Sequence, residues 1–195
     1  RIPAGKFDAA SQQPEWMLLS YKKPVTASST AENSSPELAV NEDCRSWWSA
    51  AGAEPGEWLC VDLGKDSDVR AIQVNMADEK LVVDFPADSY GDDRQTRHIE
   101  TRPQISHYTV ETSVNGADWT IRETVARECS NGYYEYADGI CARYVRVTGG
   151  ELPYGQPLRI SGLRVFGNGE GAKPAQAEAA GARVDALDAK ITWQH

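Results

Sequence analysis

The chain has 195 residues, a formal net charge of -9 and an isoelectric point near 4.9. This length suits one β-rich domain with flanking segments. The acidic balance argues against nucleic acid and against an anionic membrane surface as partners, because both are bound through basic stripes. The sequence has no run that approaches the roughly 18 apolar residues of a membrane span, and residues 1–15 lack the apolar core of a signal peptide.

The first strand signals lie between residues 57 and 75. Residues 57–64 alternate between two faces of a strand, as a half-buried strand does. One face carries Leu59, Val61 and Leu63, and the other carries Trp58, Cys60 and Asp62. Residues 69–75 form a second strand-like run.

The clearest hairpin covers residues 107–125. Alternating residues lead into Asn115-Gly116, a dipeptide that readily adopts the positive φ angles of a tight turn, and Trp119 begins the return strand. Two later strands are predicted at residues 142–149 and 158–167, and Gly162 indicates a bulge in the second. Short strands without alternating helices predict an all-β fold, an antiparallel jelly-roll β-sandwich.

Two segments fall outside the strand pattern. Residues 76–106 form a polar stretch too long for an idle connection, which predicts a functional or disordered loop. Residues 169–183 are rich in Gly, Ala and Pro and predict a linker. The expected organisation is a linker at 1–15, a sandwich at 16–168, the second linker, and at 184–195 the start of a truncated further domain. The chain is therefore expected to be a piece of a larger protein.

The four cysteines are Cys44, Cys60, Cys129 and Cys141. None forms a CxxC motif and no histidine stands at zinc-ligand spacing, which argues against a zinc site. An even count fits an oxidising compartment and allows three pairings. The two pairings that are local in sequence, Cys44–Cys60 and Cys129–Cys141, are favoured, with four free thiols as the alternative.

The sequence gives no support for catalysis. A glycosidase needs two carboxylates that face each other across a cleft, and the adjacent acids of this chain lie in loops where they are solvated. His98 and His107 have no serine or cysteine in a nucleophile context. The glycine-rich residues 167–171 lie in the linker and follow no βα unit. We therefore expect no intrinsic enzymatic activity.

Four ordered motifs carry a family resemblance. They lie at residues 37–49, 56–64 and 105–119 and in the two closing strands. Together they resemble the coagulation factor 5/8 type C (discoidin) domain, whose bacterial relatives include carbohydrate-binding module family 32. The resemblance covers about residues 16–167 and implies an eight-stranded sandwich whose loops at one end bind a ligand. A finer resemblance is to the accessory domain after the catalytic domain of some bacterial family 43 glycoside hydrolases, where a fibronectin type III-like segment follows.

The resemblance also implies where a sugar would bind. Trp48 and Trp58 resemble core tryptophans of the family, which leaves the ring of Trp47 for a ligand. Sugar binding needs an aromatic face together with planar polar groups. The residues in the three regions that form the family's site are Trp47, Tyr90, Arg94, Arg97, His98 and Tyr154.

Each of these residues has a second interpretation. The Trp47 ring is alternatively packed against a neighbouring segment, the tyrosines are ordinary loop residues, and the arginines pair with acids of the same loop. Galactose binders of family 32 commonly carry a histidine after the core tryptophan, and Ser49 stands there. This departure argues against galactose as the ligand.

The resemblance further implies a structural calcium ion. The corresponding ligands here would be Asn41, Asp43 and Ser46, while Gly162 stands where the family has a glutamate. Calcium prefers carboxylate oxygens, and this chain lacks two of the anionic ligands. The alternative is a loop held by hydrogen bonds and a domain that requires no cofactor.

Three functions from different classes are consistent with these observations. The first is a non-catalytic carbohydrate-binding module of a secreted bacterial glycoside hydrolase, extracellular or periplasmic, which raises the local substrate concentration for the attached enzyme. The second is a structural module that packs against its own catalytic domain without touching sugar. Adhesion to protein or cell surfaces is a third. The expected partners are an oligo- or polysaccharide and the catalytic domain, and the expected state is a monomer.

Overall fold

The computed structural model describes residues 16–77, 103–128 and 131–169 of the chain. These residues form eight strands and two short 3-10 helices. The strands are β1 (Met17–Leu18), β2 (Val25–Ala27), β3 (Trp48–Ser49), β4 (Trp58–Met76), β5 (Ser106–Ser113), β6 (Thr120–Arg127), β7 (Gly132–Gly149) and β8 (Arg159–Asn168). The helices are η2 (Pro36–Val40) and η4 (Pro153–Gly155).

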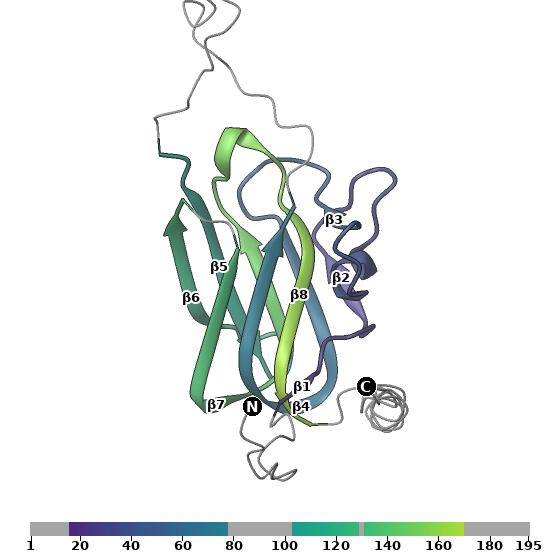
Figure 1. The fold of residues 1–195 in the computed structure, drawn as a ribbon, viewed down its shortest axis with the longest axis vertical. Coiled ribbons are helices and arrows are strands. Elements are labelled where there is room, and N and C mark those ends of the chain that lie inside the picture. Colours follow the sequence, from purple (N-terminus) through teal and green to yellow (C-terminus); the bar gives the residue numbers. More distant parts are fainter. Residues whose placement is uncertain (1–15, 78–102, 129–130, 170–195) are drawn as a thin grey trace, which may run out of the picture.

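The strands pair in antiparallel fashion and form two layers (Figure 1). Both β4 and β7 belong to each layer, because residues 58–62 of β4 pair with residues 144–148 of β7, whereas residues 67–74 pair with residues 132–142. The reversal of β4 passes through Gly64, which has a φ of 87°. One layer has the order β2–β4–β7–β5–β6 and the other β1–β8–β4–β7, with β3 beside β8. The prediction of an all-β antiparallel sandwich is confirmed.

The core lies between the layers, and the alternation of residues 57–64 explains one side of it. Leu59, Val61 and Leu63 are all buried, as predicted for the apolar face of this strand. Trp58, which alternates with Leu59 along the strand, is only half-buried and does not belong to the core cluster, so the expectation that it is a core tryptophan is wrong. Trp48 is fully buried and is the largest side chain of the core.

The β5–β6 hairpin is present, but its turn is longer than the sequence suggests. β5 ends at Ser113 and β6 begins after Trp119, so six residues connect the strands. The side chain of Asn115 accepts the backbone N–H groups of Ala117 and Asp118, both at 2.9 Å, and these bonds stabilise a wider loop. Gly116 has the positive φ that the Asn-Gly pattern predicts.

Two glycines of β8 mark irregular or crowded places. The register shifts around Gly162, where Asn75 pairs with Gly162 and Met76 with Ile160, and this confirms the predicted bulge. At Gly167 the backbone of β4 comes so close that a Cβ atom would collide with the carbonyl oxygen of Asp68. This close approach lets β8 lie beside β4 at the end of the strand.

We expect Gly167→Ala to destabilise the domain by about 1–3 kcal/mol, because backbone atoms would have to move to admit the methyl group. Thermal unfolding followed by circular dichroism measures the effect. Gly52→Ala is the matched control, since a Cβ at Gly52 would meet its nearest atom, Glu57 Oε1, only at 3.9 Å. Equal melting temperatures for the two variants would contradict the crowding at Gly167.

The structure gives no disulfide between Cys44 and Cys60, so this predicted pairing is wrong. Cys44 is an exposed free thiol, whereas Cys60 is a buried free thiol on β4. Burial raises the pKa of Cys60 to about 11, which keeps this thiol protonated. Cys141 is also free, and its predicted partner Cys129 lies outside the described residues.

The predicted linkers and the truncated domain fall almost entirely outside the described residues. This applies to residues 1–15, to residues 170–183 and to residues 184–195, as well as to most of the long polar stretch. Across the part of the chain that the structure describes, no helix has the length and apolar character needed to cross a bilayer.

Candidate functional site

The adjacent tryptophans Trp47 and Trp48 play different parts. Successive side chains of an extended segment point to opposite sides, and Trp48 at the start of β3 points into the core. Its indole N–H donates to the carbonyl oxygen of Ser29 at 3.2 Å, which fixes the ring. Trp47 is therefore directed outward, where its side chain is half-buried.

Trp47 lines a groove between two loops. The first loop contains residues 31–34 and the second leads through residues 45–47 into β3. The two are joined by the hydroxyl of Ser34, which accepts the Ser49 N–H at 2.9 Å and donates to the Trp47 carbonyl oxygen at 3.3 Å. The Ala31 N–H adds a bond to the Ser49 carbonyl oxygen at 2.9 Å. These bonds fix both walls of the groove relative to each other.

The groove has a volume of about 500 Å³. This volume falls within the range of about 300–1,000 Å³ that is typical of small-ligand sites. Its walls combine one aromatic ring with hydroxyls, an amide, a carboxylate and two guanidinium groups. The lining residues are Ala31, Glu32, Asn33, Ser34, Leu38, Arg45, Ser46, Trp47, Ser49 and Arg159.

Of the six sugar-binding residues predicted from the sequence, the structure places Trp47 in this groove. Tyr154 lies in η4, five positions before the groove residue Arg159, and it does not line the groove. It adopts a left-handed φ of 58° and is half-buried. Its role in binding stays a prediction. The other four, Tyr90, Arg94, Arg97 and His98, lie outside the described residues.

Four groove residues with charged or amide side chains were not predicted from the sequence: Glu32, Asn33, Arg45 and Arg159. Arg159 enters the groove because β3 pairs with β8 and places Ser49 opposite Arg159. Asn33 has a φ of 66° in the turn that brings the first loop to Trp47. Among these four residues, only Arg45 could have been predicted from the sequence, because it stands two residues before Trp47 on the same loop.

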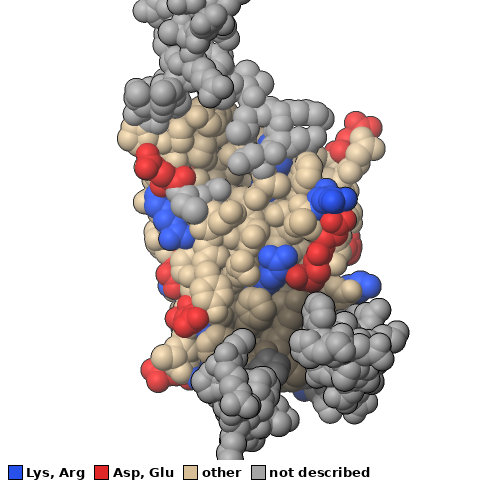
Figure 2. All heavy atoms as spheres, in the orientation of Figure 1, with Lys and Arg blue, Asp and Glu red and all other residues tan. Residues whose placement is uncertain are grey.

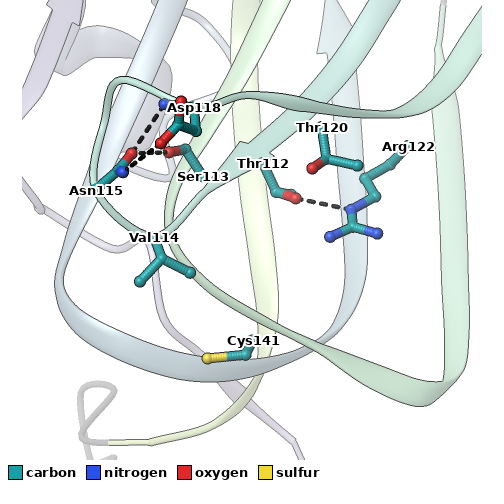
Figure 3. A pocket seen from close by; sticks show the side chains of 8 residues that line it. All are labelled: Thr112, Ser113, Val114, Asn115, Asp118, Thr120, Arg122 and Cys141. Carbon is teal, nitrogen blue, oxygen red and sulfur yellow. Dashed lines mark hydrogen bonds between the residues drawn. The ribbon is translucent and has the colours of Figure 1, made fainter.

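A second hollow lies at the β5–β6 turn and is shown in Figure 3. Its volume of about 160 Å³ is below the range of typical ligand sites. Its polar groups already bind one another, since Arg122 Nε donates to Thr112 Oγ1 at 2.8 Å and Asn115 Nδ2 donates to Asp118 Oδ2 at 2.8 Å. The groove at Trp47 is therefore the better candidate for a ligand site.

The loop predicted to hold calcium supplies poor ligands for that ion. Asn41 Oδ1 accepts the Asp43 N–H at 2.8 Å, and Asn41 Nδ2 donates to Ser46 Oγ at 2.8 Å. Asp43 Oδ1 accepts the Arg45 N–H at 2.9 Å. These bonds hold the loop's own backbone and leave Asp43 as the single carboxylate among the predicted ligands.

Calcium takes about six to eight oxygens, several of them anionic. The described residues contain no group of three or more His, Cys, Asp or Glu side chains that could hold a metal ion. Gly162 offers no side chain at the closing strand. The donor set therefore does not fit calcium.

The charged side chains of the face drawn in Figure 2 are mixed in sign. Lys and Arg residues lie beside Asp and Glu residues instead of gathering into one basic area. A basic stripe is the usual footprint of a nucleic-acid-binding surface. The face in view does not carry one.

Solved structures with the same fold include several sugar-binding modules. Chitosan-binding module 1 of a chitosanase/glucanase from Paenibacillus sp. IK-5 is 18% identical, with a TM-score of 0.58, and the match covers 77% of this chain and 98% of that one. A fucose-binding module of Streptococcus pneumoniae is 21% identical, with a TM-score of 0.57, over 80% and 99% of the two chains. The family 32 module of NanJ from C. perfringens, solved with galactose, is 16% identical with a TM-score of 0.56, over 77% and 98%. These likenesses show the fold.

No curated protein matches the chain. The family model for the NedA-like, galactose-binding domain of the F5/8 type C group matches residues 38–147, which is more than half of the chain. The match begins at Leu38 in η2 and ends at Val147 in β7, and so includes the loop of residues 45–47 that forms the second wall of the groove. The chain therefore belongs to the F5/8 type C family of NedA-like, galactose-binding domains.

Proposed function

We propose that this domain is a non-catalytic carbohydrate-binding module and that the groove at Trp47 is its binding site. The observation that carries the proposal is the outward, half-buried ring of Trp47 in a groove of about 500 Å³. An aromatic face attracts the C–H face of a pyranose, and planar polar groups take its hydroxyls. The groove brings both kinds of group together.

The polar residues of the groove have distinct parts in this proposal. Arg45 and Arg159 donate hydrogen bonds to sugar hydroxyls, and Glu32 accepts them. Asn33 does both through its side-chain amide. Because Glu32, Asn33 and Arg45 are exposed to solvent, we expect weak affinity, with a Kd of about 1 μM to 1 mM and hence about 4–8 kcal/mol of binding free energy.

Relatives with the same fold support a sugar as the ligand. One of these solved structures is a chitosan-binding module, one is a fucose-binding module and one is a family 32 module in complex with galactose. The bound sugars differ among these proteins, so the fold does not specify one sugar. The substitution of Ser49 for the histidine of galactose binders argues that the ligand of this chain is not galactose.

We propose further that the module serves a secreted bacterial glycoside hydrolase, outside the cell or in the periplasm. Tethering a weak binder to an enzyme raises the effective concentration of the substrate at the enzyme. The motifs that resemble the accessory domains of family 43 hydrolases support this parent. The module itself carries no reactive centre in this proposal.

Replacing Trp47 with alanine is expected to weaken binding at least about ten-fold, or about 1.4 kcal/mol, because the stacking face is lost. A glycan array on the purified chain identifies ligands, with fucose, galactose and chitotriose included, and isothermal titration calorimetry then compares the variants. Tyr133→Ala is the matched control, since Tyr133 is 52% exposed on β7 and does not line the groove. Equal affinity of Trp47→Ala and the parent would show that the site lies elsewhere, and binding to no glycan would favour the packing module.

A further inference from the structure

We infer that Arg164 positions the loop that carries Trp47, acting as a built-in cation where a bound metal ion would otherwise be needed. Arg164 lies on β8, and its Nε atom donates to both carboxylate oxygens of Glu42, at 3.0 and 2.8 Å. Glu42 belongs to the loop whose residues Asn41, Asp43 and Ser46 do not fit calcium. One guanidinium group therefore joins this loop to the second layer of the sandwich.

The ion pair is partly shielded from water. The side chain of Arg164 is 18% exposed and that of Glu42 is 34% exposed. Arg164 Nη1 also donates to Asn75 Oδ1 at 3.4 Å, so the guanidinium bridges the loop, β8 and β4. Partial burial and two-sided anchoring make such a pair stronger than a freely exposed one.

Gly162 leaves the space in which Arg164 lies. A Cβ atom at Gly162 would lie 3.0 Å from Arg164 Nη1 and 3.3 Å from its Cζ atom. A carboxylate side chain at this position would lie where the guanidinium now passes. The absence of a side chain at 162 and the presence of an arginine at 164 are therefore parts of one arrangement.

Glu42 supports the same conclusion from the other side of the pair. Its φ is 65°, in the left-handed region that favours glycine. A glutamate there is strained, and strained residues persist where surrounding contacts compensate for them. Among the residues that the structure describes, the side chain that contacts the Glu42 carboxylate in this way is Arg164, whose Nε atom donates to both carboxylate oxygens.

The Glu42–Arg164 ion pair, called the clamp below, affects the groove because Glu42 and Trp47 belong to the same loop. Trp47 lies five positions after Glu42 in the sequence. The hydrogen bond from Asn41 to Ser46 and the bond from the Arg45 N–H to Asp43 make this segment a hydrogen-bonded unit. Beyond it, β3 is held against β8 through the pairing of Trp48 with Ile160. Arg164 thus holds the Glu42 end of this loop, while the Trp48 end is held by the sheet. A covalent cation of this kind cannot be removed by a chelator.

Arg164→Gln is expected to lower the melting temperature by about 2–4 °C and, since this readout rests on the proposed function, to weaken glycan binding about three- to ten-fold. Addition of EDTA, or of CaCl₂ at about 5 mM, is expected to leave the melting temperature of the parent chain unchanged. This concentration is well above the dissociation constants of sensor-type calcium sites. Arg70→Gln is the control, because the Arg70–Asp68 pair has similar exposure, 28% and 38%, but lies on β4 away from the loop. It should leave glycan binding unchanged.

Reversing the two charges tests whether the effect comes from the ion pair itself or from another structural role of either side chain. Glu42→Arg and Arg164→Glu should each lower the melting temperature, and the double variant should recover at least half of the combined loss, since it restores the pair in reverse. Additive losses in the double variant would overturn the inference. So would a rise in the parent's melting temperature on addition of calcium.

A triple variant tests whether the guanidinium group of Arg164 replaces a metal ion. Asn41→Asp, Gly162→Glu and Arg164→Ala combined remove the cation and bring two more carboxylates to Asp43 and Glu42. This variant should gain a calcium-dependent rise in melting temperature that the parent lacks. If the triple variant fails to fold, charge reversal still decides the inference. Failure of every form to bind a glycan would defeat the proposed function and leave the clamp intact, whereas unchanged affinity in Arg164→Gln would defeat the positioning role alone.

Discussion

Trp48→Ala is expected to lower the free energy of unfolding by about 3–5 kcal/mol, the usual range for truncating a large buried aromatic side chain. Trp48 is the largest fully buried side chain and packs in a core shared by both layers. The substitution would also leave the Ser29 carbonyl oxygen without the indole N–H that it accepts at 3.2 Å. Urea denaturation followed by far-UV circular dichroism measures the loss.

Trp48→Phe is the matched control for this cavity. It keeps most of the ring volume and removes the N–H group, so its loss should be less than half of that of the alanine variant. Tyr133→Ala, at a site 52% exposed, should change stability by less than about 0.5 kcal/mol. A loss below about 1 kcal/mol for Trp48→Ala would mean that the ring does not hold the two layers together.

Arg146→Ala is expected to destabilise the domain by about 3 kcal/mol or more, because it leaves a buried carboxylate without its counter-charge. Arg146 Nε donates to Glu111 Oε2 at 2.6 Å, and Glu111 is only 8% exposed. The same guanidinium lies 3.9 Å from the centre of the Trp119 ring, so the variant also loses this stacking contact. Chemical denaturation at pH 7 measures the effect.

The pH dependence identifies Glu111 as the cause. Burial alone raises the pKa of Glu111, but hydrogen bonds from Arg146 and Thr148 outweigh it and hold the pKa below the ordinary value of 4.5. A lowered pKa gives stability that is present above about pH 4.5 and is lost as the pH falls through the folded-state pKa. In Arg146→Ala the burial effect is opposed only by Thr148, so this acid-side loss should shrink or reverse.

Arg70→Ala is the control for the buried pair. Its partner Asp68 is 38% exposed, and an exposed pair of this kind contributes less than about 1 kcal/mol. Similar losses for Arg70→Ala and Arg146→Ala would show that burial of Glu111 does not strengthen its dependence on Arg146.

The parts of the fold that the sequence predicted correctly depend on local patterns. The alternation of residues 57–64 shows which side chains enter the core, and Asn115-Gly116 shows where a hairpin turns. The same alternation placed Trp58 opposite Leu59, and it was the resemblance to the family that led to the wrong expectation of a core position. Local periodicity was here the better guide to burial.

The groove could be predicted only in part because it is assembled from segments distant in sequence. Trp47 was predicted since its neighbour Trp48 resembles a core tryptophan. Arg159 reaches the groove through the pairing of β3 with β8, in which Ser49 and Arg159 are 110 positions apart, and no local pattern contains that pairing. The ion pair between Glu42 and Arg164 likewise joins residues 122 positions apart.

Strand β8 also determines how the domain can be attached to other protein. Its first residue, Arg159, lines the groove, whereas Gly167 near its end pairs with Met17 of β1. β1 and the end of β8 therefore lie side by side at one end of the sandwich (Figure 1). At about 3.3 Å per residue, the eight steps from Arg159 to Gly167 place this end roughly 25 Å from the groove. A carrier joined directly to β1 or to the end of β8 would therefore lie at the end of the sandwich opposite the groove. Several copies of the domain in one polypeptide could bind neighbouring sugars at the same time. The avidity would then rise without any change in the contacts between one groove and its sugar.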